Sequence, residues 1–189
     1  MRELRLVEFL SVDGVMQGLA NPDGDFAHPG WGMDYPVQPP SEPGAANATT
    51  AYLFGRRTYE ELAAFWPTQP DDNPMAAHLN ATPKYLVSRT VPTPTWQPTT
   101  VIADDVAGSV AWLKSEGEGV ITLLGSGQLA RFLMAHDLVD RLTLVVHPLL
   151  LGTGTGLFGG LPSPRRLLLA SVAHSDLGTL ILDYRFRHD

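Results

Sequence analysis

The stretch VITLLGSGQLARFLMAH, residues 120–136, carries three structural signals in a single run. A short apolar segment suited to a buried strand ends on a glycine turn. A helical pattern follows, in which Leu129, Phe132, Leu133 and His136 recur on one face. A strand that leads directly into a helix is the unit from which α/β domains with largely parallel sheets are built. This stretch therefore predicts an α/β fold.

The segments on either side extend this unit into a whole domain. Before it, strand and helix patterns are interspersed, and after it only strand patterns remain. We predict strands at 4–10, 50–55, 83–88, 99–103, 141–152, 165–175 and 178–186, and helices at 57–65, 75–81 and 105–117. A turn signal from Asp176 to Gly178 joins the last two strands as an antiparallel hairpin. No repeat or linker interrupts the chain, so we expect a single domain over residues 1–189.

One long connection stands out between the first two predicted strands. Residues 19–47 are rich in proline and glycine and show no sustained period, and connections of this length are usually functional or disordered. The aromatic side chains of Phe26, Trp31 and Tyr35 favour function, because a solvated linker would not carry so much apolar surface. We expect this segment to form the wall of a pocket.

Composition and charge exclude several classes of function. The chain has 13 Lys and Arg against 20 Asp and Glu, a net charge of -7, which argues against nucleic acid as a partner. It has no cysteine, and its six histidines show no metal-binding spacing, so we expect no metal site. No apolar run is long enough for a membrane span, and no signal peptide is apparent, so we expect a cytoplasmic protein with no membrane contact.

Three short stretches at predicted strand ends have the residues of an anion site. They are GRRT at 55–58, VSRT at 87–90 and LLGSGQLA at 123–130. Ligands of open α/β sheets bind beyond the carboxyl ends of the strands, so the three can converge on one crevice. Glycine lets the backbone approach a phosphate, helix N-termini supply N–H donors, and arginine supplies a charged fork. A bound phosphate would also favour Arg56 and Arg57 at a helix start, where the helix dipole otherwise disfavours cations.

Each of these signals also has an ordinary structural interpretation. Arginines at a helix start are common on protein surfaces, and Asp13 with Gly14 is a typical turn pair after a strand. The GSGQLA stretch fits a dinucleotide fingerprint, but it follows several strands instead of opening the first strand-helix unit. His147, before Pro148 in an apolar strand, is most simply a packing residue.

Taken in order along the chain, five motifs resemble one known superfamily. They are SVDG at 11–14, FGRRTYE at 54–60, PKYLVSRT at 83–90, LLGSGQLARFL at 123–133 and LVDRLTLVVHPLLLGTGTGLF at 138–158. Together they resemble the dihydrofolate reductase-like superfamily, and most closely its bacterial branch related to the reductase domain of the riboflavin-biosynthesis deaminase-reductase. The resemblance implies a central, mostly parallel sheet flanked by helices, with antiparallel C-terminal strands. It also implies NADPH as the hydride donor and a homodimer.

The resemblance assigns roles to individual positions of this sequence. It implies that Gly55, Arg56, Arg57 and Thr58 face the phosphates of NADPH and that Ser88 and Arg89 face the adenosine 2'-phosphate. The pyrophosphate would be wrapped by Gly125, Ser126, Gly127, Gln128 and Leu129. Asp13 falls where nicotinamide and substrate meet, as the catalytic and substrate-binding candidate, and Trp31 and Tyr35 are the substrate-binding candidates of the aromatic segment.

The expected activity is an NADPH-dependent reduction of a small pyrimidine- or pterin-like heterocycle. Such an enzyme would be similar to 5-amino-6-(5-phosphoribosylamino)uracil reductase or to dihydrofolate reductase. Dihydrofolate reductases carry an acidic residue after the first long loop, and Asp23, Asp25, Asp34 and Glu42 cannot be matched to it. The alternative is therefore a non-catalytic nucleotide-binding protein that uses the same crevice.

Overall fold

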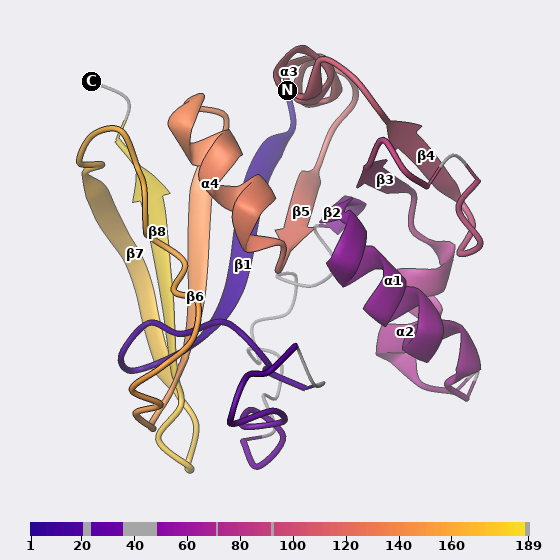
Figure 1. The fold of residues 1–189 in the computed structure, drawn as a ribbon. Helices are drawn as coiled ribbons and strands as arrows, with labels where there is room; N and C mark the ends of the chain where they lie inside the picture. The colour runs from indigo at the N-terminus through magenta and orange to yellow at the C-terminus, as the bar shows by residue number, and fades with distance from the viewer. Residues whose placement is uncertain (21–23, 36–48, 71, 92, 188–189) are drawn as a thin grey trace.

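The fold is that of a computed structural model, which describes residues 1–20, 24–35, 49–70, 72–91 and 93–187. Helices are interspersed with the strands as far as Ala135, and only strands follow the last helix (Figure 1). The strands are β1 (Glu3–Ser11), β2 (Thr49–Gly55), β3 (Lys84–Val87), β4 (Thr99–Ile102), β5 (Val120–Leu124), β6 (Arg141–His147), β7 (Leu167–His174) and β8 (Leu180–Phe186). The helices are α1 (Arg56–Phe65), the short 3-10 helix η1 (Trp66–Thr68), α2 (Pro74–Ala81), α3 (Val106–Ser115) and α4 (Gly127–Ala135).

All eight described strands form one sheet in the order β4-β3-β2-β5-β1-β6-β8-β7. Every pair from β4 to β6 is parallel, and β8 runs antiparallel to both of its neighbours. This is the predicted mostly parallel sheet with an antiparallel C-terminal end. Because the strands from β4 to β6 are parallel, their carboxyl ends lie along one edge of the sheet.

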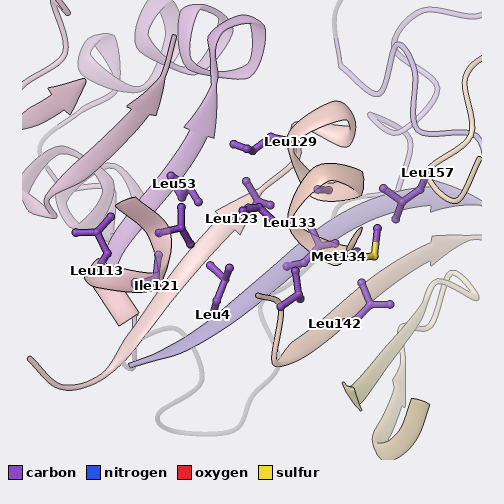
Figure 2. Packing of buried hydrophobic residues seen from close by; sticks show 14 of the residues in the cluster. Leu4, Leu53, Leu113, Ile121, Leu123, Leu129, Leu133, Met134, Leu142 and Leu157 are labelled. Atoms are coloured by element: carbon purple, nitrogen blue, oxygen red, sulfur yellow. The ribbon is translucent and has the colours of Figure 1, made fainter. Parts of the chain in front are cut away.

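The two faces of the sheet have separate hydrophobic clusters. Along β2, Ala51 and Leu53 belong to one cluster, while Tyr52 and Phe54 belong to the other, as strand alternation requires. The larger cluster packs β1 and β5 against α3 and α4, and Figure 2 shows Leu4, Leu113, Ile121 and Leu133 converging there. The smaller cluster packs Tyr59 of α1 and Leu79 of α2 on the other face.

One strand is shorter than the sequence pattern predicts. The apolar pattern predicts a single strand over residues 141–152, but β6 ends at His147. The next residue is Pro148, which has no N–H to donate and therefore cannot continue the pairing with a neighbouring strand. The segment after it stays beside the end of β1, where Val12 N–H donates to Leu149 O at 2.9 Å.

The outer strand β7 is an edge with little cover. Its Leu168, Leu169 and Val172 side chains are all more than half exposed. No helix among the described residues is long and apolar enough to cross a membrane.

Candidate functional site

The sheet brings together the three stretches that the sequence predicts to bind an anion. GRRT follows β2, VSRT follows β3 and LLGSGQLA follows β5, and these strands are adjacent at the centre of the sheet. Their carboxyl ends therefore form one edge, as the sequence predicted. The convergence comes from the parallel pairing of β2 with both β3 and β5.

The turns after β2 and β5 touch each other directly. Gly55 N–H donates to Ser126 Oγ at 2.9 Å. A Cβ at Gly55 would lie 3.4 Å from the Ser126 side chain, and one at Gly125 would lie 3.3 Å from Thr58 Cγ2. Glycine at both positions therefore allows the two turns to approach closely. Gly125 and Ser126 have φ of +62° and +68°, and the left-handed conformation of Ser126 is uncommon for a residue with a side chain.

The N-termini of the four α-helices differ in their caps. Asn73 caps α2 by accepting from Met75 N–H and Ala76 N–H, and Asp105 caps α3 by accepting from Gly108 N–H. Among the described residues, no side chain caps α1 or α4. The Ser126 hydroxyl at the start of α4 instead accepts from Gly55, outside its own helix. The two helix ends without caps are thus the two that meet at the Gly55–Ser126 contact, where an anion could accept from their N–H groups.

Two arginines line a depression beside this contact. Its volume is about 330 Å³, and it is lined by Arg56, Val87, Ser88, Arg89, Thr90, Ala103 and Val106. Arg89 is exposed, while Arg56 also pairs with Glu60 at 2.8 Å in an exposed ion pair of the kind that contributes little to stability. Guanidinium groups from two elements can therefore reach an anion in this depression.

Ser88 has a structural role in this depression. It is buried, and its Oγ accepts from Thr90 N–H and Val91 N–H, both at 3.1 Å. These bonds fix the turn that carries Arg89. Among the pyrophosphate candidates, Gln128 is exposed, whereas the Leu129 side chain is in the core, so Leu129 can offer only its backbone to a ligand.

Asp13 holds a neighbouring loop in place. Its carboxylate accepts from Ser11 Oγ at 2.6 Å, from Gly152 N–H at 2.7 Å and from Leu151 N–H at 3.2 Å. The Ser11 bond and then the two backbone bonds lower the pKa of Asp13 to about 2. At neutral pH the group is ionised and its oxygens are engaged, which favours the turn interpretation over a proton donor.

Trp31 and Tyr35 lie in an aromatic cluster at the ends of β1 and β6. Their rings are each 5.5 Å from the ring of His147, and Phe9 stacks on His147 at 6.2 Å. Trp31 is buried and donates from Nε1 to Gln17 O at 2.7 Å. The structure therefore brings both predicted substrate residues to one place, with Trp31 as a packed wall and Tyr35 half-buried. Asp25 and Asp34 are exposed, and Asp23 and Glu42 lie outside the described residues.

His147 contributes more to this cluster than the sequence pattern indicated. It is only 1% exposed, its Nδ1 lies 3.4 Å from Thr179 Oγ1, and its Nε2 has no hydrogen-bond partner among the described residues. Burial lowers its pKa, so the ring is neutral in the folded protein at neutral pH. The sequence pattern placed it inside a predicted strand over residues 141–152 and did not indicate its aromatic neighbours.

The sheet also splits next to this cluster. Pairing between β1 and β5 ends at Val7 with Leu124, whereas pairing between β1 and β6 continues to Ser11 with His147. On the side of β5, residues 8–11 of β1 therefore have no strand partner among the described residues, while they stay paired with β6 on the other side. This open side begins next to the Gly125–Ser126 turn, because Gly125 N–H donates to Val7 O. Phe9 of this stretch stacks on His147 of the aromatic cluster.

The comparisons with known proteins agree with this architecture. Residues 2–181 match the family model of the RibD C-terminal domain. The chain belongs to this family. The match confirms the resemblance that the sequence motifs indicated. No curated protein matches the chain in sequence.

Solved structures share the fold at low sequence identity. A protein from Shewanella sp. PV-4 assigned to riboflavin biosynthesis has a TM-score of 0.75 and 18% identity, with 98% of this chain and 99% of that chain covered. A deaminase and 5-amino-6-(5-phosphoribosylamino)uracil reductase from Thermotoga maritima has a TM-score of 0.65 and 12% identity, covering 98% and 57%. Dihydrofolate reductase from Enterococcus faecalis, complexed with NADP(H), has a TM-score of 0.58 and 14% identity, covering 98% and 97%.

Proposed function

We propose that this RibD C-terminal domain family member is an NADPH-dependent reductase of a small pyrimidine- or pterin-like heterocycle. Membership in the family supports an oxidoreductase, and the uracil reductase and dihydrofolate reductase that share its fold give the substrate class. The observation that carries the proposal is the meeting of two uncapped helix ends at Gly55 and Ser126, beside a depression with two arginines.

The described residues fit a phosphorylated dinucleotide. The first turns of α1 and α4 would hold the pyrophosphate through backbone N–H groups. Gly55 and Gly125 let these two turns lie close together, so that both can reach one ligand. Arg56 and Arg89 would hold a further phosphate in the depression. When bound, NADPH supplies the hydride, so the protein mainly positions two reactants and excludes water.

The aromatic cluster would form the substrate wall. Tyr35 and Phe9 are half-buried, and they offer flat apolar surface next to the split in the sheet. Asp13 would keep the loop at residues 148–152 against the end of β1 through its bonds to Leu151 and Gly152.

In this proposal the chain is one domain over residues 1–189, and the homodimer and the cytoplasmic location stay predictions.

A second candidate function is nucleotide binding without turnover. It is favoured by one observation, namely that the carboxylate expected at the reaction centre is ionised and engaged in loop contacts. The two candidates share the cofactor crevice and differ only in whether a substrate is reduced.

Calorimetric titration with NADPH and NADH, followed by an absorbance assay at the NADPH band, tests both candidates. Dihydrofolate and a ribosylamino-uracil phosphate are the first acceptors to try. Tight NADPH binding with acceptor-dependent oxidation supports the reductase, and binding without oxidation of NADPH by any pyrimidine or pterin acceptor supports the alternative. If millimolar NADPH does not bind, both candidates are wrong.

A further inference from the structure

Glu8 is a buried carboxyl group within an apolar face of the sheet. Strand alternation places it between Leu6 and Leu10, which belong to the larger core, and it is only 3% exposed. Its Oε1 has no hydrogen-bond partner among the described residues. An ionised carboxylate in such a place loses its hydration without full compensation. Burial therefore raises the pKa of Glu8 to about 8.

The position of Glu8 coincides with the split in the sheet. Gly125 N–H donates to Val7 O at 3.0 Å, and this bond is the last one between β1 and the β5 segment. In a parallel strand, alternate residues direct their backbone groups to the same neighbour, so Phe9 is the next residue to face the split. The Phe9 N–H interacts with the Glu8 carboxyl, which thus occupies a place that a strand would otherwise fill.

The first turn of α4 begins two residues after Gly125, whose N–H makes the bond at the edge of the split. Arg131, one turn into that helix, is the charged side chain that acts on Glu8, and it favours the ionised form. The guanidinium is held by Gly156 O at 3.1 Å and Leu157 O at 3.3 Å, and it lies 3.7 Å from a Cβ placed at Gly127. The strand neighbours of Glu8 are apolar, since Leu144 is its register partner in β6 and Leu124 ends β5. Glu8 and Arg131 therefore set the charge beneath the helix end at which a dinucleotide phosphate would bind.

We propose that neutral Glu8 is a positioning residue of this crevice, and that its ionisation weakens the binding of a phosphorylated dinucleotide. This inference rests on the proposed function. A negative charge at the split would offset the field of the uncapped α4 N-terminus and of Arg131, and it would repel the diphosphate. Binding should therefore favour the protonated carboxyl, so the free protein takes up a proton when NADPH binds above pH 8.

Isothermal titration of NADPH from pH 6.5 to 9.5, in buffers of different ionisation enthalpy, tests the proposal. For the wild-type protein we expect Kd to rise about tenfold or more between pH 7.5 and 9.5, since each unit above the pKa of the free group can cost up to tenfold. At pH 8.5 binding should take up a substantial fraction of a proton. Glu8→Gln, which keeps the shape but cannot ionise, should give a flatter profile and lose this uptake.

Two comparisons assign the effect to Glu8. Glu118→Gln changes an exposed carboxylate on the loop before β5 and should retain the wild-type profile. Lys84 also titrates in this range, because burial lowers its pKa to about 8. Lys84 is present in both proteins, so the difference between the pH profiles of wild type and Glu8→Gln reports on Glu8 alone. Thermal unfolding at pH 8 checks the fold, and there Glu8→Gln should be at least as stable as wild type, because the wild-type fold disfavours the charged group.

The failures of the two proposals are distinguishable. If wild type binds NADPH but takes up no proton at pH 8.5, the Glu8 inference is wrong and the proposed function stands, whether or not the variant folds. Equal pH profiles for wild type and Glu8→Gln would likewise show that the Glu8 inference is wrong. If wild type does not bind NADPH at any pH, the proposed function is wrong and the inference falls with it.

Discussion

The two halves of the candidate site differ in how they use their polar groups. At the ends of β2, β3 and β5, the helices α1 and α4 have no side-chain caps, and Arg89 is exposed in a depression. At the ends of β1 and β6, by contrast, Asp13 and Trp31 direct their polar atoms to backbone groups of the same chain. In the proposed function, the first half would hold a charged ligand from outside. The second half already uses these polar atoms in its own contacts, so a ligand there would meet mainly the aromatic surface of Tyr35 and Phe9.

The largest expected effect comes from a bulky side chain at the start of α4, in the first half of the site. Gly127→Val should weaken NADPH binding by roughly 100-fold or more, because a branched side chain would crowd the first turn of α4. A Cβ there would overlap the Met16 side chain, with Cε only 2.7 Å away, so Met16 or the helix start must move. Calorimetric titration measures the affinity, and thermal unfolding checks the fold. Gly159→Val is the matched control, because a Cβ there meets nothing within 4 Å. Unchanged NADPH affinity in a folded Gly127→Val protein would place the crevice elsewhere.

Removing one charge from the same half should have a smaller and selective effect. Arg89→Ala should weaken NADPH binding by roughly tenfold to a hundredfold and leave NADH nearly unchanged, since a charge-assisted bond to the 2'-phosphate contributes about 1.5 to 3 kcal/mol. Parallel titrations with the two dinucleotides measure this selectivity. Arg166→Ala, an exposed arginine before β7, is the control. An equal loss for NADPH and NADH would remove Arg89 from this role.

In the second half of the site, His147 should make the stability of the protein depend on pH. Burial lowers its pKa, so below about pH 6.5 the unfolded chain binds a proton that the fold does not, and stability falls as pH falls. His147→Phe removes this pH-dependent loss of stability, because phenylalanine does not titrate. Its Tm should fall less than that of wild type between pH 7 and pH 5, leaving a gap of a few degrees at pH 5. Parallel Tm curves for the two proteins would show that His147 is not the titrating group.

The smallest expected effect concerns Asp13. Asp13→Asn keeps the size and the turn preference but weakens the bonds from Ser11, Leu151 and Gly152. The folded-state pKa is lowered from 3.8 to about 2, so the contribution is fully present above about pH 4 and is lost as pH falls through 2. At pH 7 the Tm should be slightly lower than wild type while the NADPH affinity is unchanged, and the gap in Tm should close near pH 2. A catalytic role would instead appear as a roughly 100-fold loss of turnover at unchanged Tm.

Local sequence patterns predicted the elements of this fold because each signal lies within a few residues. The GSGQ turn, for example, marked both the end of β5 and the start of α4. The convergence of the three predicted anion-binding stretches also followed from local patterns, through the rule that parallel strands share one carboxyl edge. The end of β6 at His147 was missed because the apolar pattern continues past Pro148, which stops strand pairing.

Contacts between distant segments could not be predicted in the same way. The bond between Asp13 and Gly152 joins residues 139 positions apart, and the bond between Gly55 and Ser126 joins residues 71 apart. Neither leaves a pattern in the sequence around it, because both depend on which strands are neighbours in the sheet. Glu8 does stand out in the sequence, as the single acidic residue within the run LRLVEFL. Its proposed role could be recognised only once the structure had shown the split between β1 and β5.

The bond from Gly55 N–H to Ser126 Oγ has a consequence for dynamics. It links the starts of α1 and α4, so an opening motion at one turn must break a bond at the other. In hydrogen–deuterium exchange, the amides of these two first turns should therefore respond together when a ligand reaches either one, although the helices pack on opposite faces of the sheet. The capped helices α2 and α3 take no part in the Gly55–Ser126 bond, so the exchange rates of their first-turn amides should not change with it.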